Sequence, residues 1–363
     1  MKKNKNYVDL KDQPVPEGQH LLEVDDLKMY FHTEDGVVRA VDGVSYTLDR
    51  GETLGVVGES GSGKSVTAMT IMGRISMPPG KIEGGDVRYR GRSILEMSEE
   101  EMQHIRGNDI AMIFQDPMTS LNPVYKIGKQ VGEGLRLHRG YSKQEALQRA
   151  TELLDLVGIP EPEKRVNEYP HQFSGGMRQR VMIAMALACD PDILIADEPT
   201  TALDVTIQAQ IIELMQEMQE KNGNAIIMIT HDLGVVADMA DKIMVMYAGR
   251  PVEFGTAEEI FYESRHPYTW GLIRSIPEQA IDEKKPLTPI HGNPPSLMNL
   301  PEGCVFSPRC PYATDKCRKQ RPERVVTESG HYSACHFSGD PEFLKNAPET
   351  SRTRKDSKKG GEA

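Results

Sequence analysis

A glycine-rich segment at residues 58–65 restricts the folds that this chain can adopt more than any other feature of the sequence. The segment has the form G-x-x-x-x-G-K-S, which is typical of a phosphate-binding loop. It consists of Gly58, Glu59, Ser60, Gly61, Ser62, Gly63, Lys64 and Ser65. The apolar run from Thr53 to Val57 predicts a buried parallel strand before the loop, and residues 65–75 can form a helix after it. This order predicts an α/β fold that binds a nucleotide.

The residue types of the loop suit a triphosphate. Successive backbone N–H groups and the positive end of the helix dipole can face phosphate oxygens. Lys64 would reach the β- and γ-phosphates, and the Ser65 hydroxyl would bind Mg²⁺. An ordinary glycine-rich turn is the alternative, but the flanking strand and helix favour nucleotide binding, and we expect ATP with Mg²⁺.

Polar side chains follow three later apolar runs, which are predicted to be core strands. The runs are 110–114, 193–196 and 225–230. Asp197 can hold Mg²⁺, and Glu198 can orient and deprotonate the attacking water. Gln115, at the carboxyl end of a strand where ligands bind in open α/β sheets, is assigned to the catalytic group and to the Mg²⁺ site. His231 is a candidate γ-phosphate sensor. The alternatives are a helix-capping carboxylate pair and a structural histidine.

Two further features would touch the nucleotide. Ser174 would cap a helix that begins with Gly175 and Gly176. Two glycines there cost roughly 1 kcal/mol each relative to alanine, which makes sense where a phosphate approaches the backbone. In the strand-rich segment before the loop, Phe31 could stack on the adenine, with Tyr30 as the rival; equally, both rings could simply pack the sheet.

Composition limits the class of partner. The chain has 363 residues and a formal net charge of −11, which argues against binding to nucleic acid. No apolar run reaches transmembrane length, and the basic residues 1–6 are not followed by an apolar segment as in a secretion signal. We therefore expect a cytoplasmic chain that reaches the membrane only through a partner.

Four of the five cysteines crowd into one C-terminal segment: Cys304, Cys310, Cys317 and Cys335. In a reducing cytosol such crowding favours a metal over disulfides. Four thiolates suit a [4Fe–4S] cluster or a structural zinc ion, and the spacing alone does not decide between them. Four buried cysteines without a ligand are the third possibility.

These motifs, in this order, resemble those of the ATP-binding subunits of ABC transporters. The resemblance spans residues 22 to about 255 and marks 174–177 as the signature and Asp204 as the D-loop residue. Met177 departs from it, because the usual signature has Gln there, but Ser174 and Gly176 are intact. The resemblance implies a P-loop NTPase (RecA-like) core with an antiparallel β subdomain and a helical insertion. It also implies that two such subunits sandwich two ATP molecules head to tail.

Three segments resemble the oligopeptide/dipeptide importer branch more narrowly: 114–123, 266–268 and 303–311. This resemblance implies an ATPase that powers peptide uptake, although some close relatives carry nickel. It implies a second ATPase subunit (a paralogue), two permease subunits and an extracytoplasmic solute-binding protein as partners, at the cytoplasmic face of the cell membrane. Relatives with this cysteine segment are associated with a [4Fe–4S] cluster, which we therefore expect ahead of zinc.

The expected domains follow from these motifs. Residues 1–18 and 346–363 are expected to be disordered tails, 19–258 the ATPase domain with a helical subdomain at about 118–180, and 259–345 a small cysteine-containing domain. A soluble ABC ATPase that acts on DNA or ribosomes is less favoured, because the chain has one cassette, no long heptad run and an acidic balance. A non-hydrolysing nucleotide binder would lack Glu198 or His231, and both are present.

Overall fold

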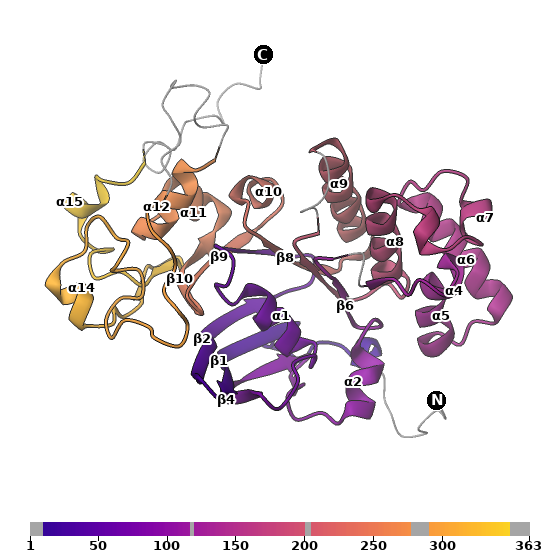
Figure 1. Cartoon of the computed structure of the whole chain (residues 1–363), viewed down its shortest axis with the longest axis horizontal. Helices are drawn as coiled ribbons and strands as arrows, with labels where there is room; N and C mark the ends of the chain where they lie inside the picture. Colours follow the sequence, from indigo (N-terminus) through magenta and orange to yellow (C-terminus); the bar gives the residue numbers. More distant parts are fainter. Residues whose placement is uncertain (1–9, 117–119, 200–204, 277–289, 349–363) are drawn as a thin grey trace, which may run out of the picture.

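A large mixed sheet runs through the molecule (Figure 1), a computed structural model that describes residues 10–116, 120–199, 205–276 and 290–348. Within these residues the sheet has eight strands, in the order β11-β12-β10-β9-β3-β8-β7-β6. Their bounds are β3 (Thr53–Val57), β6 (Ile110–Ile113), β7 (Ile193–Asp197), β8 (Ala225–Thr230), β9 (Lys242–Tyr247), β10 (Arg250–Thr256), β11 (Val325–Val326) and β12 (Tyr332–Ser333). Five of these strands, β6, β7, β8, β3 and β9, run parallel to one another, so their carboxyl ends lie at one edge.

A second, antiparallel sheet lies below the first in Figure 1 and has the order β2-β1-β4-β5. Its strands are β1 (Leu22–Thr33), β2 (Gly36–Leu48), β4 (Gly80–Tyr89) and β5 (Arg92–Ser93). The strand-rich segment predicted before the phosphate loop forms the two long strands β1 and β2. A register shift between Val24 and Leu27 interrupts their pairing, but Asp26 takes a positive φ of 44° and β1 continues beyond the bulge.

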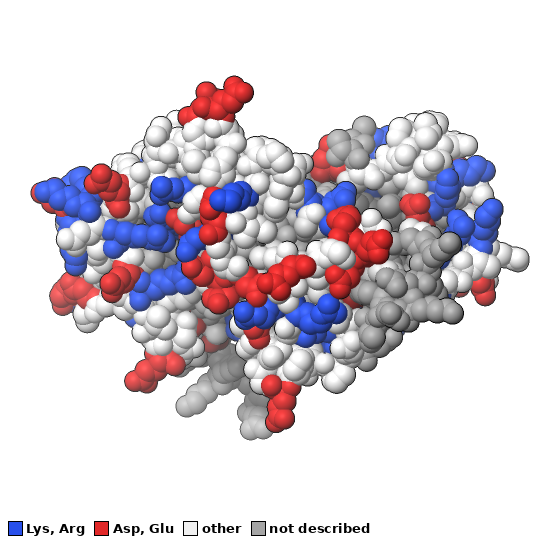
Figure 2. All heavy atoms as spheres, turned by 90° about the horizontal axis from the view of Figure 1, so that it is seen from below, with Lys and Arg blue, Asp and Glu red and all other residues white. Residues whose placement is uncertain are grey.

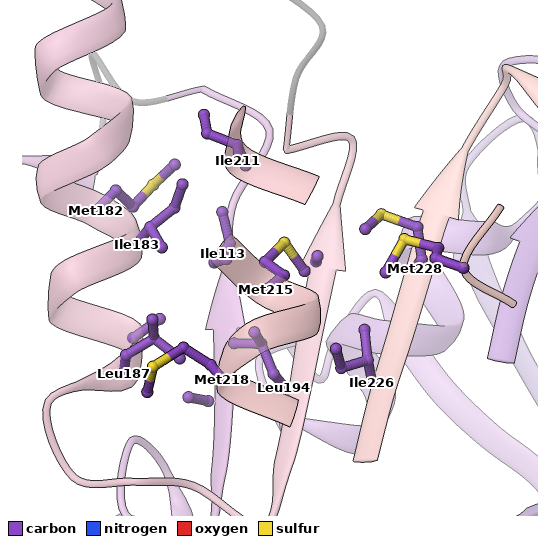
Figure 3. Packing of buried hydrophobic residues seen from close by; sticks show 14 of the residues in the cluster. Ile113, Met182, Ile183, Leu187, Leu194, Ile211, Met215, Met218, Ile226 and Met228 are labelled. Atoms are coloured by element: carbon purple, nitrogen blue, oxygen red, sulfur yellow. The ribbon is translucent and has the colours of Figure 1, made fainter. Parts of the chain in front are cut away.

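Helices cover one side of the parallel strands. Between β6 and β7 lie α4 (Ile127–Val131), α5 (Glu133–His138), α6 (Lys143–Leu156), α7 (Pro162–Arg165) and α8 (Gly175–Leu187). Ser142 and Glu145 form a capping box at the start of α6. Figure 3 shows side chains of α8 and of α9 (Val205–Asn222) packed against β6, β7 and β8. Leu187, Met215 and Leu194 from these elements are each almost fully buried. The strands therefore rest on a continuous apolar layer that fixes their carboxyl ends.

The helix that follows the phosphate loop in the chain, α1 (Lys64–Ile71), lies between the two sheets (Figure 1). The helix ends four residues earlier than the run predicted from the sequence, because Gly73 with φ 57° closes it. A further helix, α2 (Glu99–Ile105), begins with a capping box at Ser98. The antiparallel sheet and α1 share a second buried apolar cluster.

The C-terminal region continues the large sheet, because β12 pairs with β10. Its helices are α11 (Ala257–Tyr262), α12 (Pro267–Arg274), α14 (Asp315–Lys319) and α15 (Pro341–Leu344), whereas α10 (Leu233–Ala237) lies earlier, between β8 and β9. The fully buried Trp270 of α12 packs on Tyr312 and Phe343, with ring centroids 5.7 and 5.3 Å away. The region thus has an aromatic core of its own and is also joined to the cassette by strand pairing.

The described N-terminal residues pack against the rest of the chain. Leu10 begins a 3₁₀ helix (Leu10–Asp12) and is 1% exposed, and Lys11 donates a hydrogen bond to the carbonyl oxygen of Cys189 at 3.1 Å. The loose tail expected for residues 1–18 therefore includes a packed segment, which the many polar residues around Leu10 concealed.

Within the described ranges, no helix is long and apolar enough to cross a membrane. On the face that Figure 2 shows, acidic and basic side chains are interspersed.

Candidate active site

The phosphate loop connects β3 to α1 and needs glycine at two points. A Cβ atom on Gly58 would lie 2.2 Å from the carbonyl oxygen of Met246, and one on Gly63 would lie 2.3 Å from that of Ala40. Both glycines also have positive φ values, 151° and 100°. Gly63 is the N-cap of α1, so the first N–H groups of the helix open toward the loop. The close packing of the backbone fixes the shape of the loop.

Lys64 lies inside this loop and is almost fully buried. Its ammonium group donates to the carbonyl oxygens of Gly58 (2.7 Å) and Glu59 (3.1 Å). Burial lowers the pKa of Lys64, and the negative charges of Glu198, Asp197 and Glu59 oppose this. These acceptors hold the ammonium where a phosphate oxygen can replace them.

Ser62 supports this interpretation. Its hydroxyl is buried and has no hydrogen-bond partner among the described residues. A buried polar atom of this kind is uncommon in native structures, and it fits a site that a phosphate group completes.

The next strand to carry functional groups is β7. Ser65 donates from its hydroxyl to Oδ1 of Asp197 at 2.8 Å, so the two predicted Mg²⁺ ligands are in contact. Burial raises the pKa of the Asp197 carboxyl, and the neighbouring Glu198 adds to this rise while the Ser65 hydrogen bond opposes it. A divalent cation at this point would favour the charged carboxylate.

Three predicted catalytic residues from three strand ends meet at the same edge. Nε2 of Gln115 donates to Oε2 of Glu198 at 2.9 Å, and Nδ1 of His231 lies 3.5 Å from Oε1 of the same carboxylate. His231 is 58% exposed, whereas Glu198 is 13% exposed, so the carboxylate lies deeper and the imidazole faces solvent. Glu198 also has a positive φ of 47°, a strained conformation for a residue with a side chain.

The remaining predicted residues lie away from this group at the strand ends, or outside the residues that the structure describes. Ser174 caps α8 as predicted, accepting a hydrogen bond from the N–H of Met177 at 3.3 Å, and it is exposed together with Gly175. Gly176 is half-buried in the same first turn. Phe31 is half-buried on β1, where it pairs in register with Val38.

Asp204, the predicted D-loop residue, lies outside the described residues. Gly61 and Ser60, the exposed positions of the phosphate loop, complete the predicted set.

Contacts that the sequence patterns did not reveal hold the loop from two distant segments. The hydroxyl of Tyr268 accepts a hydrogen bond from the N–H of Glu59 at 2.9 Å, and Arg309 forms an ion pair with the Glu59 carboxylate. A separate contact supports the catalytic strand end: Gln179 on α8 donates to the carbonyl oxygen of Pro199 at 2.5 Å. The partners in these contacts are up to 250 positions apart in the chain, so no local periodicity could pair them.

The four clustered cysteines lie around one cavity in the C-terminal region. All four line it, together with aromatic side chains such as Phe337 and Phe343. All are free thiols. Burial raises the pKa of Cys310 to about 11 and that of Cys335 to about 12. In the described part of the chain, no group of three or more His, Cys, Asp or Glu side chains is arranged to hold a metal ion.

The phosphate loop, the Ser65–Asp197 contact and the Glu198 group define a phosphate-loop nucleoside triphosphatase. A lysine and a helix N-terminus can bind the phosphates, and a carboxylate held by Gln115 can activate water.

Comparison with known proteins narrows this class. The family model described as "ABC transporter" matches residues 41–201, and the one described as "Oligopeptide/dipeptide transporter, C-terminal region" matches 252–317. The oligopeptide transport ATP-binding protein OppD of Bacillus subtilis is 58% identical over 312 residues, which cover 86% of this chain and 87% of that protein. The dipeptide transport ATP-binding protein DppD of Escherichia coli is 52% identical over 320 residues, covering 88% and 97%.

A solved structure has the same architecture. A dimeric ATP-binding cassette, in a post-hydrolysis state with bound ADP and phosphate, is 28% identical and covers 65% of this chain and 98% of its own, with a TM-score of 0.59. The chain therefore belongs to the family of ATP-binding proteins of ABC transporters, and it is an ATPase of that type. The predicted family and the predicted α/β P-loop NTPase fold are confirmed, whereas the separate cysteine-containing domain stays a prediction.

Proposed function

We propose that this chain hydrolyses ATP to power the uptake of dipeptides or oligopeptides through a membrane permease. The observation that carries the proposal is the meeting of Gln115, Glu198 and His231 at the strand ends beside the phosphate loop. The peptide substrate is supported by relatives named as oligopeptide and dipeptide transport proteins that match most of this chain. Nickel or another small solute is the second candidate, and none of these relatives favours it.

Each residue of the site has a separable task in this proposal. The backbone of the phosphate loop and Lys64 bind the β- and γ-phosphates. Ser65, Asp197 and Gln115 would hold Mg²⁺, which would neutralise charge at the phosphates. Glu198 orients water and accepts its proton, and His231 contacts the γ-phosphate from the exposed side of the site.

A second ATPase subunit completes the site from outside the chain. The first turn of α8, with Ser174, Gly175 and Gly176, is accessible and can bind the γ-phosphate of an ATP held by a partner subunit. Asp204 would contact the partner near this point, and Phe31 would stack on the adenine. In this arrangement ATP stabilises the closed pair and hydrolysis opens it, which supplies the two states that a permease needs.

The proposed assembly lies at the cytoplasmic face of the membrane. It contains a second ATPase subunit of the same family, two permease subunits and a solute-binding protein on the far side. Within this chain, residues 19–258 form the ATPase domain, the helices at about 118–180 contact the permease, and residues 259–345 form the cysteine-containing domain. The proposed segment at 118–180 contains exposed apolar side chains that suit such a contact, among them Val124 and Tyr125.

We further propose that the four clustered cysteines, whose side chains are not arranged around a metal ion in the described structure, would hold a [4Fe–4S] cluster, with zinc as the second choice. Their four side chains line one cavity, and the backbone N–H two residues further along faces the sulfur in three of them: Cys304, Cys310 and Cys335. Such N–H groups stabilise metal-bound thiolates. The cluster would hold a loop-rich segment together.

The cluster is tested by metal analysis of protein purified without oxygen. We expect iron and sulfide at about four atoms each per chain and absorption at roughly 400 nm, as for other Cys₄ clusters. Cys317→Ala should abolish both, whereas Cys189→Ala, which removes a buried cysteine that does not line this cavity, should leave them unchanged. Protein with zinc and no iron would assign the second choice, and metal-free wild-type protein would refute both.

The transport function is tested by purifying the intact complex from membranes through a tag on this chain. We expect permease subunits to copurify, and cells that lack the chain to lose uptake of a labelled tripeptide but not of Ni²⁺. The reverse pattern of uptake would assign the nickel alternative, and a chain that copurifies only with ribosomes or DNA would contradict membrane transport altogether.

A further inference from the structure

Two residues of the C-terminal region, Tyr268 and Arg309, bind the phosphate loop at Glu59. This residue is restrained at three points. Its N–H donates to the hydroxyl of Tyr268, its carbonyl oxygen accepts from Lys64, and its carboxylate is bound by Arg309. Tyr268 is fully buried on α12, so the anchor of the N–H group is rigid.

Arg309 is built into this position. Its guanidinium binds Glu59 in a fork, with Nη1 at 2.5 Å from Oε2 and Nη2 at 3.0 Å from Oε1. The other N–H groups donate to the carbonyl oxygens of His291 (2.9 Å) and Ile290 (3.2 Å) and to the hydroxyl of Tyr247 (3.3 Å). All five guanidinium donors are thus used, and the Arg309 side chain is only 4% exposed.

The Arg309–Glu59 ion pair reduces electrostatic repulsion between the phosphate loop and ATP. ATP brings several negative charges to this site, and a bare carboxylate at Glu59 would repel them. Glu59 is 30% exposed and close enough to influence Lys64, so its charge is felt in the centre of the loop. A salt bridge in a forked geometry removes that repulsion and leaves the backbone of Glu59 fixed.

The segment that supplies Arg309 is the cysteine segment itself. Arg309 directly precedes Cys310, and Phe306 of the same segment packs on Tyr247 and Tyr268, with ring centroids 5.2 and 5.4 Å away. The position of Arg309 is therefore set by the same turn that places the cysteines around their cavity.

We propose that Arg309 is a positioning residue for ATP binding, which neutralises Glu59 and thereby prepares the phosphate loop for the triphosphate. Arg309 acts through Glu59 and does not touch the nucleotide. The proposal rests on ATP binding at this loop and does not depend on the transported solute, so a failure of peptide transport leaves it intact.

A double-mutant cycle on the full-length chain tests it, with MgATP affinity from titration calorimetry as the readout. Arg309→Gln should weaken MgATP binding about tenfold or more, because it leaves a charge without its charge-assisted partners. Added to Glu59→Gln, the same substitution should change the affinity less than about twofold, since the charge it compensates is gone. Arg309→Lys, which keeps the charge and loses the fork, should fall between.

A matched control is Arg318→Gln, which breaks an exposed pair with Asp315 (3.1 Å) in the same region. This control should leave MgATP affinity unchanged. The unfolding midpoint of every variant, measured without nucleotide, shows whether a loss of affinity comes from a loss of stability. Wild-type MgATP affinity in Arg309→Gln would overturn the proposal. An equal loss of MgATP affinity when Arg309→Gln is made in the wild-type chain and in the Glu59→Gln chain would also overturn it. If Arg309→Gln does not fold, wild-type affinity in Arg309→Lys overturns it.

Discussion

Replacing Glu198 by Gln removes the proposed base and leaves the surrounding contacts in place. In the wild-type chain Oε2 of Glu198 accepts a hydrogen bond from Gln115 at 2.9 Å, and a glutamine carbonyl can accept the same bond. The substitution therefore changes basicity more than geometry. General-base catalysis contributes about 10²- to 10⁴-fold, so kcat for ATP hydrolysis should fall by that factor, or about 3–5 kcal/mol in activation free energy.

The assay is phosphate release by the assembled transporter over a range of MgATP concentrations. KM should stay within about threefold of wild type, because phosphate binding depends on the loop and not on Glu198. With turnover blocked, MgATP should also hold the two ATPase subunits together during gel filtration. Glu217→Gln, an exposed carboxylate on α9, is the control and should behave as wild type. A kcat within threefold of wild type for Glu198→Gln would remove Glu198 from its role as base.

Three further substitutions test how the fold supports the site. Asp192→Ala leaves the buried Arg90 without the carboxylate that binds it at 2.5 Å, so it should lower the free energy of unfolding in urea by about 3–5 kcal/mol; a loss below 1 kcal/mol would contradict this. Gly63→Ala places a Cβ atom 2.3 Å from the carbonyl oxygen of Ala40, so MgATP affinity, measured by calorimetry, should fall at least about tenfold. Wild-type affinity in this variant would contradict the need for glycine at this position. Ser142→Ala removes a capping box and should cost about 1 kcal/mol in urea unfolding, with MgATP affinity retained; an unchanged unfolding free energy would disprove the role of the cap.

Much of the site could be predicted because its parts are local motifs at strand ends. The apolar runs before Gln115, Asp197 and His231 are short and continuous, as buried parallel strands are. Since such strands align their carboxyl ends, the residues that follow them meet at one edge, and the structure brings Gln115, Glu198 and His231 together there. The capping residue Ser174 could be predicted because its signal is also local.

The rest depends on contacts between distant segments, which no local pattern encodes. Arg309 and Glu59 are 250 positions apart, and no sequence pattern pairs them. The buried Leu10 is surrounded by polar residues, so its segment resembled a loose tail. Asp25 and Asp26 interrupt the apolar alternation of β1, and the bulge explains how one strand continues through them.

The most direct test of the account is simultaneous measurement of phosphate release and peptide uptake in proteoliposomes. The vesicles contain this chain, its partner ATPase and the permease, and they receive a peptide-loaded binding protein outside and MgATP inside. We predict that peptide accumulates only while phosphate is released, and that Glu198→Gln stops both. Phosphate release with no peptide movement, or peptide accumulation that continues in the Glu198→Gln vesicles, would contradict it.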